Sequence, residues 1–178
     1  IAKALGHTIN KISPALAPIA LDQKLSEAEG ITATITVKIG KKEFSDSAVI
    51  TRRGLSGPLA ENISYMLPQK REIILSFAEV SKESIKAENG KTLLKNALNI
   101  PTRLSKALLG NLAEKKIAEL KKDELSYIVE RITNLKTNAI AIKEGAMSTH
   151  GGVSMDEVNT KTMESKLVSK LYFAGDIL

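Results

Sequence analysis

The chain contains no cysteine among its 178 residues, and its only histidines are His7 and His150. Without thiols it can form neither a disulfide framework nor a thiolate metal site. Two histidines are too few ligands for a zinc site by themselves. We therefore expect no metal centre, and the lack of cysteine is typical of a cytoplasmic protein.

Aromatic residues are scarce, at 3% of the chain, and there is no tryptophan. Proteins that bind single-stranded nucleic acid usually offer several aromatic rings on which bases stack. The net charge of +6 favours such a partner, but the densest basic cluster, Lys115 to Lys122, is interleaved with acidic residues as on a solvated helix face. The composition therefore argues against a nucleic-acid partner.

No apolar run approaches the roughly eighteen residues that a membrane-spanning helix needs. The longest, from Ala15 to Leu21, is interrupted by Pro18. No basic segment followed by an apolar block marks a signal peptide. These features predict a cytoplasmic protein without a membrane partner. The first residue is Ile1 rather than methionine, and we expect a piece of a longer protein.

Residues 30–51 have the pattern of β-strands. From Ile31 to Ile39 apolar residues alternate with threonines and one lysine, the period of a strand. Gly40-Lys41-Lys42 predicts a turn, and residues 47–51 predict the partner strand. A third strand is expected over 71–77. Several antiparallel strands of this kind are enough for a small barrel or sandwich.

From Ser81 to about Lys136 the apolar residues recur at helical spacing. Ser81 is a suitable N-cap for a first helix, which Asn89-Gly90 ends. Three more helices are expected around 93–98, from Pro101 to Gly110 and from residue 122 onward; short strands follow over 139–142 and 146–149. The predicted fold class is α+β. Residues 1–78 with 137–178 would form a small antiparallel β-barrel-like domain, and residues 79–136 an inserted helical bundle.

The segment from Thr149 to Asp176 has the composition of a cofactor wall. Gly151 and Gly152 lack a Cβ, so their backbone N–H groups can approach a flat or anionic group closely. The apolar residues Leu171 to Ala174 predict a strand, and Asp176 at its end could accept hydrogen bonds from the hydroxyls of a sugar or ribityl chain. Spacing alone favours a buried strand closed by a Gly-Asp turn, which is common turn chemistry.

Three blocks of the sequence resemble one bacterial flavoprotein family. They are Leu5-Gly6-His7 followed by Pro14-Ala15-Leu16, then Gly54-Leu55-Ser56-Gly57-Pro58, and finally Thr149-His150-Gly151-Gly152-Val153 leading through Thr162-Met163-Glu164-Ser165-Lys166 to Leu171-Tyr172-Phe173-Ala174-Gly175-Asp176. The family comprises NAD(P)/FAD-dependent oxidoreductases and contains aminoacetone oxidase and a dehydro-bile-acid reductase. The blocks occur in the family's order and span nearly the whole chain.

The resemblance implies that this chain is an insert, a β-barrel with a helical subdomain, that interrupts an FAD domain and ends just after re-entering it. Its partners would be the rest of the FAD domain, a small-molecule substrate and a nicotinamide cofactor. Thr149, Gly151 and Gly152 would lie near the flavin ring, and Asp176, where the family usually has Glu, near the ribityl or pyrophosphate. No Gly-x-Gly-x-x-Gly is present, so the chain alone should bind FAD poorly and be incomplete for catalysis.

The block around Pro58 also has a direct interpretation. Gly54 and Gly57 permit tight backbone geometry around Ser56, and Pro58 would begin a helix whose N-terminal N–H groups attract an anion. Arg52, which stands where the family usually has His, would strengthen that attraction to a carboxylate or phosphate. A plain strand-to-helix turn with exposed arginines explains the same residues.

Two hypotheses of function follow. In the first, the chain covers the flavin and shapes the substrate pocket of an FAD-dependent oxidoreductase, with His150 as the candidate proton carrier. In the second, it is an autonomous module that binds a protein or nucleic acid. They differ in one observable feature: a piece of a flavin domain should expose apolar surface where the rest of that domain packs, and a finished module should not.

Overall fold

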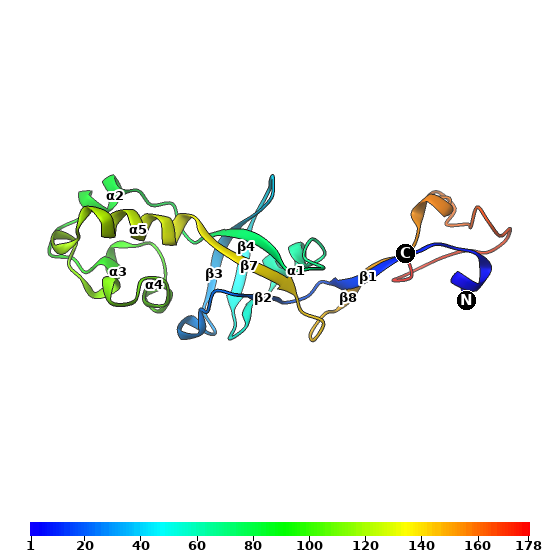
Figure 1. Cartoon of the computed structure of the whole chain (residues 1–178), viewed down its shortest axis with the longest axis horizontal. Coiled ribbons are helices and arrows are strands. Elements are labelled where there is room, and N and C mark those ends of the chain that lie inside the picture. Colours follow the sequence, from blue (N-terminus) through cyan, green and yellow to red (C-terminus); the bar gives the residue numbers. More distant parts are fainter.

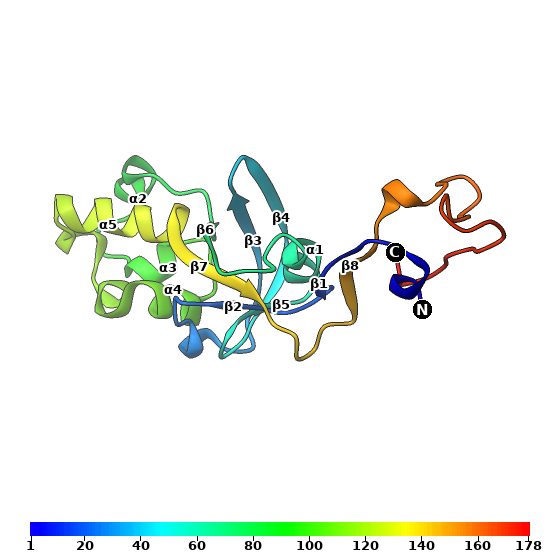
Figure 2. The same ribbon diagram turned by 45° about the vertical axis from the view of Figure 1, so that its right-hand side comes forward.

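The computed structural model describes all residues from Ile1 to Leu178 and shows three parts in a row (Figure 1). A β-barrel lies in the middle and a group of helices at one end, while a two-stranded ribbon leads to a small terminal part at the other end. Figure 2 shows the same order after a turn of the molecule. Both chain termini lie in the terminal part.

The barrel is closed and antiparallel, in the strand order β2-β5-β4-β3-β6-β7. This confirms the expected α+β class and decides between barrel and sandwich. Closure leaves no unpaired edge on the sheet. Its strands are β2 (Ile19–Leu21), β3 (Thr32–Ile39), β4 (Lys42–Ile50), β5 (Gly54–Ser56), β6 (Arg71–Ser76) and β7 (Leu135–Ala141), with the helix α1 (Pro58–Ser64) after β5.

The longest hairpin, β3 with β4, follows directly from the sequence alternation. Gly40 takes the left-handed conformation, with φ of 61°, at the turn that the sequence predicts. Ile35 and Val37 face the core, and Thr34 and Thr36 face outward. The expectation that β4 begins at residue 47 was wrong, because the polar residues from Lys42 onward pair fully with β3 in a half-exposed strand.

The helices fill the segment between β6 and β7, as expected for an insert in the barrel. Ser81 caps α2, accepting from the Ser84 N–H while the Ser84 hydroxyl accepts from the Ser81 N–H. The second helix is a single turn, and Pro101 stands before its helix as N-cap rather than inside it. The helices are α2 (Lys82–Ala87), α3 (Leu94–Ala97), α4 (Thr102–Leu109) and α5 (Lys122–Thr133).

The ribbon pairs β1 (Ile9–Ala15) with β8 (Ser148–Val153), and the chain enters and leaves the barrel through it. The sequence did not predict β1, and β8 lies slightly beyond the strand expected at 146–149. The predicted strand at 171–174 was wrong: only an isolated bridge, Glu164 to Tyr172, forms there, because this chain provides no neighbouring strand to pair with that segment.

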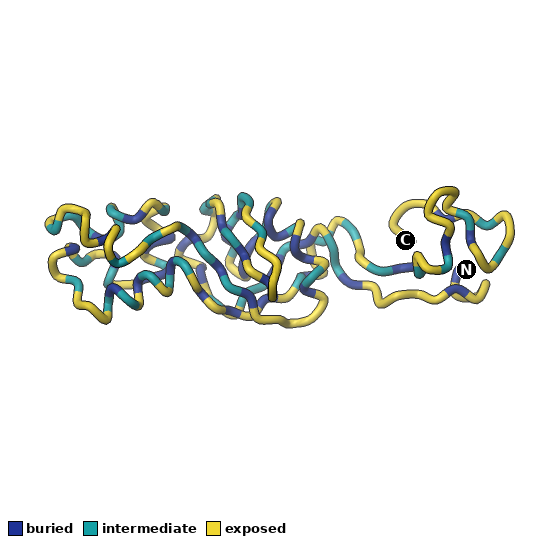
Figure 3. The backbone as a smooth tube through the Cα atoms, turned by 90° about the horizontal axis from the view of Figure 1, so that it is seen from above, coloured by how far each residue is buried: buried dark blue, intermediate teal, exposed yellow.

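The hydrophobic core is distributed very unevenly. One cluster of 29 buried residues runs through the barrel and the helices, whereas the terminal part has a cluster of only four, Ala2, Val153, Val158 and Phe173. In Figure 3 the tube of the terminal part is accordingly mostly exposed. None of the helices combines the length and apolar character that crossing a lipid bilayer would require.

Candidate functional site

An open pocket of about 490 Å³ lies beside the ribbon, where it meets the barrel. Thr149 and Asp176 both line it, together with Ile12, Lys143 and Met147. The Thr149 hydroxyl and the Asp176 carboxylate make no hydrogen bond or ion pair within the chain, so both are free to bind a ligand. The fold thus brings together two of the four residues that the sequence analysis proposed as candidates for cofactor binding.

The ribbon separates Thr149 from His150. Successive side chains of a strand point to opposite faces, and Thr149 lies in the pocket while the His150 ring tilts against Tyr65 at the end of α1. The centroids of the two rings are 5.6 Å apart. The candidate proton carrier and the free carboxylate of Asp176 are therefore not on the same side of the ribbon.

Gly151 and Gly152 are required by the protein's own backbone. A Cβ on Gly151 would lie 2.4 Å from the Lys11 carbonyl oxygen, and one on Gly152 would lie 2.3 Å from that of Ile177. The Val153 N–H donates to the same Ile177 carbonyl at 2.8 Å. Backbone atoms of β1 and of the C-terminal segment occupy the space that the missing Cβ atoms leave. The close approach to these two glycines is therefore made by this chain's own backbone rather than left open for a cofactor.

Asp176 also borders a second, adjacent pocket of about 360 Å³ that Gly152, Ile177 and Ile9 line. It follows Gly175, which has a φ of 76° and turns the chain back toward the ribbon. Ile9 and Ile177 are both exposed apolar side chains. This end of the molecule therefore presents a carboxylate between two hollows with apolar rims.

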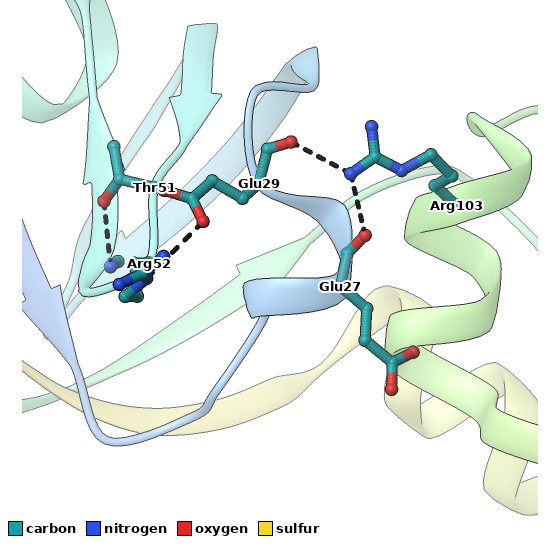
Figure 4. A network of polar contacts seen from close by, with 6 residues as sticks. Glu27, Glu29, Thr51, Arg52 and Arg103 are labelled. Atoms are coloured by element: carbon teal, nitrogen blue, oxygen red, sulfur yellow. Dashed lines mark hydrogen bonds and ion pairs between the residues drawn. The ribbon is translucent and has the colours of Figure 1, made fainter.

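The residues of the predicted anion site are spread out along β5. Arg52 lies in the turn before this strand, where its Nε is 3.6 Å from the Glu29 carboxylate (Figure 4). Gly54 allows β5 to approach the Ile19 carbonyl of β2, and Gly57, at the other end of β5, is the N-cap of α1. The structure thus places the Arg52 guanidinium at one end of the strand and the helix N-terminus at the other.

A clamp that the sequence analysis missed ties the start of β1 to the terminal part. The Thr8 hydroxyl and N–H donate to the two carboxylate oxygens of Glu157, each at 2.8 Å. The hydrogen bond from the hydroxyl, and after it the one from the N–H, lowers the pKa of Glu157 below its usual value. The residues are too distant in sequence for any local pattern to have shown the pairing.

His7 adds to the same connection. It is buried, its Nε2 lies 2.8 Å from Ser165 Oγ, and its ring packs edge-on against Phe173. This is the environment of a structural side chain. No group of three or more His, Asp or Glu side chains gathers where it could hold a metal ion.

Comparison with known proteins supplies the family. Residues 13–142, which span the barrel and the helices, match the family described as HI0933-like protein barrel and H2TH domain. A ribosomal RNA dihydrouridine synthase of Escherichia coli K12 is 28% identical over 195 aligned positions, covering 100% of this chain and 48% of the relative. One from Haemophilus influenzae is 31% identical, covering 88% of this chain and 42% of the relative.

The chain thus spans about half the length of the curated relatives it matches. The family match agrees with the flavoprotein resemblance at a coarse level, whereas the names of the two relatives refer to ribosomal RNA rather than to small molecules. The chain belongs to the HI0933-like family, as its barrel with inserted helices.

Proposed function

We propose that this chain is the substrate-covering insert of an FAD-dependent oxidoreductase, incomplete for catalysis without the rest of the FAD domain. The observation that carries the proposal is the distribution of exposed apolar side chains. Of fourteen large hydrophobic residues that are exposed, eleven lie in 1–16 and 147–178, and the other three are Tyr65, Tyr127 and Ile140.

This concentration of apolar surface separates the two hypotheses of function. An autonomous module would bury such residues or spread them singly over its surface. Here they surround a terminal part with only four buried core residues, which is too small a core to be stable alone. The barrel and helices, with their core of 29 residues, show no such deficit. The ribbon and terminal part are thus the surface that a further domain would cover.

The residues beside the ribbon fit part of an FAD molecule. Thr149 Oγ1 and the Asp176 carboxylate are free in a pocket large enough to admit the edge of a flavin or its ribityl chain. Nothing there resembles a pyrophosphate site, because the chain has no Gly-x-Gly-x-x-Gly and Lys143 is the only cation lining the pocket. When bound, FAD would supply the hydride chemistry, and this chain would contribute orientation and shielding from water.

For the substrate, we propose a uridine of ribosomal RNA that the complete protein reduces to dihydrouridine. The names of the two relatives support this, and they outweigh the scarcity of aromatic residues that argued against nucleic acid. Reduction of the uracil C5–C6 double bond adds one hydride and one proton, with a nicotinamide cofactor as the source of electrons. His150, the candidate proton carrier, lies beside Tyr65 on the face of the ribbon opposite Thr149, so it can donate this proton only to a uracil bound on that face.

The test is the dihydrouridine content of ribosomal RNA, measured by mass spectrometry of its nucleosides. Deleting the gene that encodes the complete protein should remove dihydrouridine from the RNA, and re-expressing it should restore the modification. An Asp176→Ala variant should restore less, because the pocket loses its carboxylate. Dihydrouridine that persists unchanged in the deletion strain would refute the RNA substrate.

A further inference from the structure

A groove of about 540 Å³ lies on the far side of the barrel from the ribbon, where β3 and β6 meet the loop between α3 and α4. Thr32, Thr34 and Ser76 are among the barrel residues that line it, and Asn99 and Ile100 are among those of the loop. No motif in the sequence drew attention to this groove. The groove lies between the barrel and the inserted helices, both of which belong to the segment that matches the family.

The polar side chains of this groove are without partners. The hydroxyls of Thr32, Thr34 and Ser76 and the amide of Asn99 make no hydrogen bond within the chain. Thr36, on the same face, differs because its hydroxyl donates to Ser45 Oγ at 3.0 Å. Side chains two apart on a strand share a face, and Ser76 pairs with Thr36 across the strands, so the free groups form one surface.

The lining also includes the apolar residues Phe77, Ile100 and Pro101. Uncharged donors and acceptors beside apolar side chains suit a nucleobase with its ribose, which presents hydroxyls, ring edges and a stacking face. A phosphate would gain little here, since the only charged residue lining the groove is Glu79.

Cations lie just outside the groove rather than in it. Arg103 follows two residues after Pro101. Its Nη2 donates to the carbonyls of Glu27 and Glu29, as Figure 4 shows, and its other nitrogens make no hydrogen bond or ion pair within the chain. Lys38 continues the outward face of β3 beyond Thr36, but its Nζ lies 3.1 Å from the Glu43 carboxylate, which offsets its charge. A phosphate beside a bound nucleotide would therefore meet chiefly the Arg103 guanidinium.

We propose that this groove holds one unpaired nucleotide of the RNA substrate, at a distance from the pocket beside the ribbon. The inference rests on the proposed RNA substrate. Because base edges inside a duplex are already paired, the groove would select a single-stranded segment. The elongated molecule would then contact the RNA at two points, one on each side of the barrel.

The experiment measures binding of the full-length protein to a fluorescein-labelled single-stranded RNA of about 12 nucleotides by fluorescence anisotropy, a length within the reach of such sites. Thr34→Val removes one hydroxyl at nearly constant shape, and Asn99→Leu removes the amide. Thr160→Val, in an exposed loop of the terminal part, is the matched control. Each groove variant should weaken binding about threefold to tenfold, the effect of one lost hydrogen bond.

Several outcomes would overturn the proposal. If both groove variants bind the RNA as tightly as the unmodified protein and Thr160→Val, the groove does not contact RNA, although the substrate can still be ribosomal RNA. If a fully paired duplex binds as tightly as the single strand, selection of an unpaired nucleotide is wrong. If the groove variants weaken binding but the deletion strain keeps its dihydrouridine, the groove stands and the proposed reaction fails.

Discussion

Replacement of Gly151 by alanine tests whether the ribbon depends on close backbone approach. Gly151 has a φ of 105°, and its added Cβ would lie 2.4 Å from the Lys11 carbonyl oxygen, where ordinary contacts begin at 3.4 Å. The unusual φ alone costs about 1–3 kcal/mol in a residue with a side chain. The overlap adds a further cost of about 1–3 kcal/mol, because Lys11 lies in the irregular stretch of β1 opposite Gly151, held between the paired residues Asn10 and Ser13.

Gly6→Ala is the matched control. Gly6 has a φ of 91° but nothing within 4 Å of an added Cβ, so it carries the conformational cost without the overlap. Hydrogen exchange followed by mass spectrometry reports local opening of each element. Gly151→Ala should raise exchange over β1 and β8 and leave β3 and β4 protected, while Gly6→Ala should leave the ribbon unchanged. Equal ribbon protection in both variants would mean that the ribbon does not depend on the close approach of Gly151 to Lys11.

Three further predictions concern the rest of the fold. Arg103→Met removes two hydrogen bonds to carbonyls of the segment between β2 and β3, and it should lower the free energy of unfolding by about 1–2 kcal/mol in urea titrations. Lys106→Met loses only a surface ion pair and should cost less than about 0.5 kcal/mol. Equal effects of the two substitutions would contradict a bridging role for Arg103. Ile35→Ala, in the fully buried barrel core, should cost about 2–5 kcal/mol, and a smaller loss would mean a loosely packed barrel.

The third concerns acid. The hydroxyl and N–H of Thr8 lower the pKa of Glu157 in the folded state below its usual 4.5, so the unfolded state binds the proton more readily. The clamp therefore contributes to the free energy of unfolding above pH 4.5. This contribution is lost as the pH falls through the lowered pKa of the folded state. The amide chemical shift of Thr8 should follow this titration, and Glu157→Gln should abolish it; an unchanged titration in the variant would exclude Glu157 as its cause.

The sequence predicted best the elements that local patterns determine. The β3–β4 hairpin and the Ser81 cap follow from alternation and from capping chemistry. β1 is largely polar and contains Pro14, so it becomes a strand only through pairing with the distant β8. β2 and β5 have three residues each, which is too short for an alternating pattern to show. Residues 171–174 have the composition of a strand but lack a partner in this chain.

The candidate site was predictable in its members and not in its geometry. Thr149 and Asp176 were singled out by motif, and the fold places both in one pocket. Their neighbours Gly151 and Gly152 serve backbone contacts with Lys11 and Ile177, which no local pattern could show because those partners come from elsewhere in the chain. The groove at Thr34 was missed because alternating threonines in a strand carry no functional signal by themselves.

We propose that this chain carries one wall of a flavin site and the domain that covers it. A direct test compares flavin absorbance after purification of the full-length protein and of this 178-residue chain at equal concentration. We expect a yellow full-length protein with bound FAD and a colourless chain. A chain that retains flavin by itself, or a full-length protein that binds none, would contradict it.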